Sequence, residues 1–249
     1  MRLTAKRICK FTAQFISILL FLLFIGLCSL LGVKVYASYH VAQTKQQLIE
    51  TRLLSTPGKD WSKGMLAINE DYVGWLTVYG TDVNGPVVQG KDNNEYLRTD
   101  IYKEHSEPGT LFVDESVDMD VDGNVIIYGH MMKDGSMFGT LKQYKKKSFF
   151  KENRIVRWED KNGEHYYSIF AAMVINGTPG DERFLDLTQW TNEISEEKAT
   201  DMLTTLQERS YAFQPNMLRN PDNKYLFLVT CDYSHKNDRL VLVAERNDV

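Results

Sequence analysis

The sequence Tyr225-Leu226-Phe227-Leu228-Val229-Thr230-Cys231 has the apolar, aromatic and β-branched composition of a β-strand, and it ends on a cysteine. A polar segment, Asp232 to Asp238, follows, and Arg239 then opens a second apolar run, Leu240–Ala244. Two apolar runs joined by a short polar segment predict a pair of neighbouring antiparallel strands. In such a pair Cys231 and Arg239 can face each other near the open end.

Short apolar runs also recur upstream of this pair, separated by glycine, asparagine and aspartate. They are Trp75–Val78, Pro86–Val88, Thr110–Val113, Asn124–Tyr128, Ile155–Trp158 and His165–Ile175. With the two C-terminal runs they predict about eight strands, at a spacing that suits a closed barrel or a sandwich. The fold class is therefore mainly β.

Helical patterns are few in this part of the chain. Apolar residues recur with the period of a helix at Ala199, Met202, Leu203 and Leu206. This spacing predicts an amphipathic helix over Ser195–Arg209, between two late strands. The segments Phe138–Leu141 and Lys145–Phe150 are compatible with a shorter helix.

The N-terminal region has the composition of a membrane anchor. An uncharged stretch of 23 residues runs from Phe11 to Val33, between Lys10 and Lys34. A helix of about 20 apolar residues crosses the hydrocarbon core of a bilayer. Because basic residues precede the stretch and no acidic residue occurs before Glu50, residues 1–10 are expected in the cytoplasm and the rest outside the cell.

A cleaved signal peptide is the alternative, with Val35-Tyr36-Ala37 as a tolerable cleavage site. Its apolar region would be longer than the usual stretch of about 7–15 residues, which favours an uncleaved anchor over residues 11–33. Residues 34–64 are predicted to form a stalk or linker, with a helix over 41–54 that ends before Thr56-Pro57-Gly58. Residues 65–249 are then one domain, long enough to build a core.

The charge of the external part argues against a nucleic-acid partner. Five of the 29 Lys+Arg residues lie at positions 2–34, so 24 basic residues face 33 acidic ones beyond the anchor, a formal charge of −9. An acidic domain repels phosphate backbones. Phosphate-backbone binding is therefore not expected.

Cys231 is the only cysteine outside the predicted tail and anchor, which hold Cys9 and Cys28. An unpaired thiol in an extracellular domain is either an inert buried residue or a nucleophile. A nucleophilic cysteine usually works with an imidazole. Among the five histidines, His130 follows the strand Asn124–Tyr128 and a glycine, a position typical of catalytic residues, although a plain surface or hydrogen-bonded histidine is equally compatible.

The remaining histidines have weaker contexts. His235 lies in the loop between the two C-terminal strands and is expected to be solvated. His40 lies on the stalk, and His105 and His165 have charged neighbours. Arg239 is by default a solvated strand end, but a guanidinium there can stabilise a thiolate and the oxyanion of a tetrahedral intermediate.

Taken together, these residues resemble the sortases, and among them class B. The segments that carry the resemblance are Leu228-Val229-Thr230-Cys231, Tyr128-Gly129-His130, Asp238-Arg239-Leu240-Val241, Val73-Gly74-Trp75, Pro86–Gly90, Asn93–Leu97 and Gly109–Asp114. One departure is Phe227, where the family motif has a threonine. The resemblance covers nearly all of residues 65–246.

The resemblance implies an eight-stranded β-barrel on the outer face of a Gram-positive cell membrane, and a transpeptidase that passes an acyl group from a sorting motif to an amine. It implies that Cys231 is the nucleophile, His130 the general acid and base, and Arg239 the group that holds substrate and oxyanion. Substrate contacts would map to four further residues: Asn93, Leu97, Tyr128 and Thr230. No cofactor or metal is expected, and no Cys/His cluster has zinc spacing.

The acceptor amine stays open between a lysine on a pilin, in pilus assembly, and a peptidoglycan cross-bridge, in wall anchoring. The chain shows neither the N-terminal lid motif nor the second span of class C pilin enzymes. A papain-like peptidase is disfavoured because those enzymes place the cysteine before the histidine. The non-enzyme alternative is a membrane-tethered binding or scaffold protein with an inert buried thiol.

Overall fold

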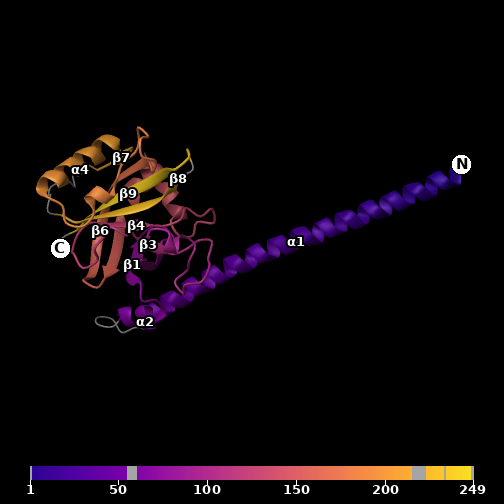
Figure 1. Cartoon of the computed structure of the whole chain (residues 1–249), viewed down its shortest axis with the longest axis horizontal. Coiled ribbons are helices and arrows are strands. Elements are labelled where there is room, and N and C mark those ends of the chain that lie inside the picture. Colours follow the sequence, from indigo (N-terminus) through magenta and orange to yellow (C-terminus); the bar gives the residue numbers. More distant parts are fainter. Residues whose placement is uncertain (1, 55–60, 215–222, 233, 248–249) are drawn as a thin grey trace. The chain divides into compact units, whose positions relative to one another are not determined.

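The computed structural model describes residues 2–54, 61–214, 223–232 and 234–247, and the chain divides into two compact units, Met1–Glu50 and Thr51–Val249. The first unit consists of one long helix, α1 (Arg2–Leu54), whose last turn belongs to the second (Figure 1). Within α1, Phe15–Tyr36 has a mean hydropathy of 2.8 and the length to cross a membrane. This window overlaps the predicted span, and the predicted helix over 41–54 is part of the same α1.

After the last turn of α1, the next described element of the second unit is α2 (Trp61–Ile68), which crosses the predicted boundary between residues 64 and 65. The domain boundary at residues 64 and 65 stays a prediction. The predicted helix end before Thr56-Pro57-Gly58 falls on residues 55–60, which lie outside the described residues. The strands are β1 (Tyr72–Val78), β2 (Asn84–Val88), β3 (Leu111–Val113), β4 (Val125–Tyr128), β5 (Ile155–Asp160), β6 (Gly163–Asn176), β7 (Ala212–Phe213), β8 (Tyr225–Asp232) and β9 (Asp238–Arg246). The other helices are η1 (Glu95–Leu97), η2 (Gly139–Lys145), α3 (Lys147–Glu152), η3 (Thr188–Trp190) and α4 (Glu196–Arg209).

The sheet closes on itself. In the described part of the chain the strand order is β5-β1-β2-β3-β4-β8-β9-β6, and β6 pairs back with β5. The two-residue β7 adds to β6 outside this ring. The result confirms the predicted mainly β fold as an eight-stranded barrel rather than a sandwich.

Strand β8 is apolar from Tyr225 to Val229 because both of its faces are buried there. Leu226 and Leu228 join the core cluster that includes Leu76 and Ile127 of β1 and β4. Phe227 and Val229 alternate onto the other face, into a second cluster that also contains the α4 and η3 residues Met202, Leu206 and Trp190. Figure 1 shows α4 lying outside the strands, where it covers this face. An uninterrupted apolar run is the sequence pattern of such a doubly covered strand.

The predicted strands and the predicted helix are present, whereas α2, η1, η3 and β7 were not predicted and the C-terminal hairpin differs in detail. Strand β8 includes Asp232 and β9 begins at Asp238, and these two residues are register partners, so the connection is shorter than the polar segment suggested. Both carboxylates are buried and hydrogen-bonded, which is how the strands accommodate them. The helix predicted over 195–209 is α4, with the Ser195 side chain accepting from the Lys198 amide at 3.3 Å. The 138–150 region forms η2 and α3.

Candidate active site

Cys231 lies on the outer face of the barrel, next to the last residue of β8. Along this strand Phe227, Val229 and Cys231 share one face by the two-residue period, and the first two pack under η3 and α4. Cys231 lies at the edge of this buried surface and is itself only partly buried. The strand thus fixes the backbone of the thiol while leaving the sulfur accessible.

Arg239 is the direct register partner of Cys231 across the β8–β9 hairpin. It alternates onto the same face as Val241 and Val243, which belong to the cluster under α4. Its guanidinium is partly buried, and Nη1 donates to the backbone oxygen of Asp238 at 3.2 Å. The predicted meeting of Cys231 and Arg239 in one hairpin is therefore present in the structure.

His130 reaches the same place from a distant part of the sequence. Strand β4 runs parallel to β8, with Tyr128 opposite Val229, and the Gly129 amide donates to the Val229 carbonyl at 3.2 Å. Two residues beyond the Tyr128–Val229 pair, His130 is level with Cys231 and hydrogen-bonds its thiol. The Nε2–H of His130 donates to the Leu97 carbonyl at 2.8 Å, which leaves Nδ1 for the sulfur.

The electrostatics of the pair favour charge separation. The hydrogen bond from His130 lowers the pKa of the Cys231 thiol, burial opposes this effect, and the nearby charge of Arg239 assists it. The same hydrogen bond raises the pKa of His130, against a smaller effect of burial, and the Leu97 carbonyl adds to the rise. Both shifts widen the pH range in which a thiolate can face an imidazolium.

A groove of about 330 Å³ opens at these three residues. Its walls come from the ends of β4 and β8, from the segment around η1, and from the loop between β6 and η3. All four residues predicted to contact substrate line it, namely Asn93, Leu97, Tyr128 and Thr230. Their roles stay predictions, but the structure brings all of them together with the cysteine, histidine and arginine.

Thr230 differs from the other three in its surroundings. Only 2% of its surface is exposed, and its hydroxyl has no hydrogen-bond partner among the described residues. A buried hydroxyl without a partner is unusual and costs free energy. By the two-residue alternation its side chain shares the inner face with Leu226 and Leu228, so a substrate contact at the groove would come from its backbone.

Asp114 is a residue whose role in the site the sequence did not reveal. It is 1% exposed, and its Oδ2 accepts from the Asn93 amide at 3.0 Å and from the Tyr128 hydroxyl at 2.9 Å. Its Oδ1 accepts from the amide and hydroxyl of Ser116, while the Glu115 amide donates to Asn93 Oδ1 at 2.9 Å. One buried carboxylate thus orients two groove residues. The only sequence signal was its position directly after a strand, at the end of Gly109–Asp114.

The other histidines lie elsewhere. The His235 side chain is 71% exposed, close to the solvated state predicted for it, but its Nδ1 also contacts the Asp238 carboxylate at 3.0 Å. His105 is exposed beside Glu107, and His165 contacts Arg246. Among the described residues, no group of three or more His, Cys, Asp or Glu side chains is arranged to hold a metal ion.

Comparison with known proteins gives a consistent result. A sortase-domain family model matches residues 76–247. Sortase B of Staphylococcus aureus is 28% identical over 212 residues, covering 84% of this chain and 83% of that protein. Sortase B of Listeria monocytogenes is 31% identical over 175 residues, covering 70% and 68%. A solved Staphylococcus aureus sortase B–substrate complex matches with a TM-score of 0.73 and 25% identity, covering 85% of this chain and 98% of that one.

The barrel and these matches define an enzyme of the transpeptidase class, not a scaffold protein and not a papain-like peptidase. The chain belongs to the sortase family and, within it, to class B.

Proposed function

We propose that this chain is a membrane-anchored sortase that cleaves a C-terminal sorting motif of secreted proteins and transfers the acyl fragment to a primary amine. The observation that carries the proposal is the meeting of three residues at one groove: Cys231 on β8, Arg239 on β9, and His130 directly after β4. A sulfur with a lowered pKa beside an imidazole is the arrangement that covalent acyl transfer requires.

In the first step the Cys231 thiolate attacks the carbonyl carbon of the scissile peptide bond. The C–N bond breaks, the amine leaves with a proton from His130, and a thioester remains on the sulfur. In the second step an incoming amine gives a proton to His130 and attacks the thioester, which releases the thiolate. Arg239 stabilises the oxyanion in both tetrahedral intermediates, a role that suits a guanidinium fixed opposite the nucleophile.

We assign the sorting peptide to the groove beside the nucleophile. Leu97 and Tyr128 offer apolar surface, and Asn93 offers an amide whose orientation is fixed by Asp114 and Glu115. An extended peptide needs this combination of apolar pockets and a few polar partners. Thr230 would contact the residue next to the cleaved bond.

We propose that α1 anchors the enzyme, with residues 1–10 in the cytoplasm and the barrel outside the cell. The length and hydropathy of Phe15–Tyr36 and the basic residues before it support this orientation. Alkaline extraction of membranes would test the anchor: full-length protein released into the supernatant would contradict it.

The activity test uses the full-length chain in detergent micelles, a panel of sorting-motif peptides, and hydroxylamine as acceptor. Mass spectrometry is expected to find a hydroxamate product that is absent with Cys231→Ala and with His130→Ala. Absence of product from every peptide, together with a Cys231 that resists alkylation, would contradict the proposal.

The same assay separates the two acceptors. Hydroxylamine is replaced by an equimolar mixture of a peptide that carries a pilin-type lysine and a peptidoglycan cross-bridge peptide. Product on the lysine peptide alone would support pilus assembly, and product on the cross-bridge alone would support wall anchoring.

A further inference from the structure

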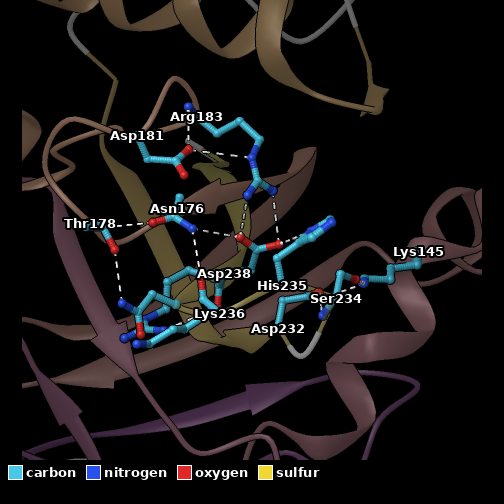
Figure 2. Close-up of polar contacts among 12 residues, drawn as sticks. Lys145, Asn176, Thr178, Asp181, Arg183, Asp232, Ser234, His235, Lys236 and Asp238 are labelled. Atoms are coloured by element: carbon cyan, nitrogen blue, oxygen red, sulfur yellow. Dashed lines mark hydrogen bonds and ion pairs between the residues drawn. The ribbon is translucent and has the colours of Figure 1, made fainter.

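Asp238 is a buried carboxylate at the first residue of β9, directly before Arg239, and it is 0% exposed. Figure 2 shows three side chains converging on it from separate segments. Arg183 donates to both oxygens at 3.0 Å, Asn176 donates through Nδ2 at 3.0 Å, and His235 contacts it at 3.0 Å. None of these contacts is part of the proposed chemistry.

Arg183 connects this carboxylate to a wall of the groove. It lies in the loop 177–187 between β6 and η3, and the residues directly after it, 184–188, all line the groove. The loop folds back on β6. The backbone N–H of Asn176 donates to the backbone carbonyl of Arg183 at 3.1 Å, and Phe184 forms an isolated parallel β-bridge with Asn176. The Arg183 guanidinium therefore binds Asp238 directly before residues 184–188, which form the groove wall.

We propose that Asp238 and Arg183 form a clamp that positions the groove wall 184–188 against the β8–β9 hairpin, where Cys231 and Arg239 lie. Both are positioning residues for binding of the sorting peptide, and this role rests on the function proposed above. A guanidinium that meets both oxygens of a carboxylate fixes direction as well as distance, which a single contact does not.

The ion pair between Asp238 and Arg183 is present throughout the neutral pH range, because Asp238 stays ionised there. The hydrogen bond from Arg183 is the main reason that the pKa of Asp238 falls to about 2, with burial opposing it and His235 and Asn176 assisting. Since the folded-state pKa is depressed, the stabilisation is present above the ordinary carboxyl pKa and is lost only as the pH falls toward 2. Peptide binding is therefore expected to show no dependence on Asp238 protonation near neutral pH.

The test compares Arg183→Gln and Arg183→Lys in the full-length chain with a matched control, Arg246→Gln. Arg246 also pairs with a carboxylate, Asp122 at 2.9 Å, but at the opposite end of β9. Arg183→Gln is expected to raise the KM for the sorting peptide about tenfold while kcat changes less than about threefold. Arg183→Lys should recover part of the loss, and the control should leave KM unchanged.

A second measurement does not depend on turnover. Hydrogen exchange of the backbone amides in 177–188 is expected to be faster in Arg183→Gln and unchanged in the control. Unchanged exchange would overturn the clamp, and faster exchange with an unchanged KM would overturn its role in peptide binding. If exchange accelerates as expected but no variant or parent enzyme turns over any peptide, the proposed function fails and, with it, the role in peptide binding, while the clamp itself stands.

Discussion

Cys231 owes its chemistry to two side chains and one backbone carbonyl. The thiol contacts His130, faces Arg239, and is oriented indirectly by Leu97, whose carbonyl holds the imidazole. Every residue has a carbonyl, so no sequence pattern could have pointed to that last contact. At this scale the structure adds supporting groups to residues that the sequence had already singled out.

The pH dependence of thiol reactivity follows from the His130 contact. Because this hydrogen bond is the main cause that lowers the pKa of Cys231, His130→Ala should move the alkylation profile toward higher pH. Because the thiolate is the reactive form, the alkylation rate at neutral pH should fall accordingly. Iodoacetamide kinetics across the pH range would measure it, with His105→Ala, an exposed histidine away from the thiol, as the control. Coincident profiles for parent and His130→Ala would contradict the assigned contact.

Asp114→Asn should weaken substrate binding without affecting the nucleophile. The substitution replaces one of the two carboxylate oxygens by an NH2 group. Either Asn93 and Tyr128, which donate to Oδ2, or Ser116, which donates to Oδ1, then loses its acceptor. We expect a destabilisation of about 1–3 kcal/mol and a higher KM for the sorting peptide, with the alkylation rate of Cys231 unchanged. Chemical denaturation and steady-state kinetics would measure both.

The control for that substitution is Asp134→Asn. Asp134 accepts from the amide and hydroxyl of Ser136 in the same way that Asp114 does from Ser116, but it is exposed. It should change neither stability nor KM appreciably. Equal effects of the two substitutions would mean that Asp114 has only a local structural role.

At the scale of elements, the departure at Phe227 has a packing explanation. Its ring is fully buried and stacks on Trp190 of η3 at a centroid distance of 6.2 Å, within the cluster that attaches α4 to β8. A threonine would leave a cavity there and bury a hydroxyl. The aromatic residue at this position therefore serves the contact between strand and helix and not the chemistry.

Phe227→Thr should accordingly destabilise the enzyme by about 3–5 kcal/mol, in the range of large-to-small core substitutions. Phe227→Leu, which keeps more of the volume, should cost clearly less. The free energy of unfolding in denaturant would measure both, while alkylation of the folded fraction should proceed at the parent rate. A threonine variant as stable as the parent would contradict this account of the packing.

At the scale of the whole molecule, closure of the barrel assembles the site. The parallel pairing of β4 with β8 joins segments about a hundred residues apart and brings His130 to Cys231. The closing pair β5–β6 completes the ring and leaves β6 beside β9, where its end and the loop after it form the far wall of the groove. Long-range pairing of this kind has no local sequence signature.

The sequence by itself determined the eight strands of the barrel, the α4 helix, the barrel class, the candidate anchor and seven of the residues that line the groove. These properties follow from local composition, from side-chain periodicity and from the family motifs. Only the tertiary structure decided which buried carboxylates hold the site together. Asp114 and Asp238 read as ordinary polar residues at strand ends, because their partners come from segments far away in the sequence. Hydrogen bonds across such distances depend on how the chain closes, so no local pattern predicts them.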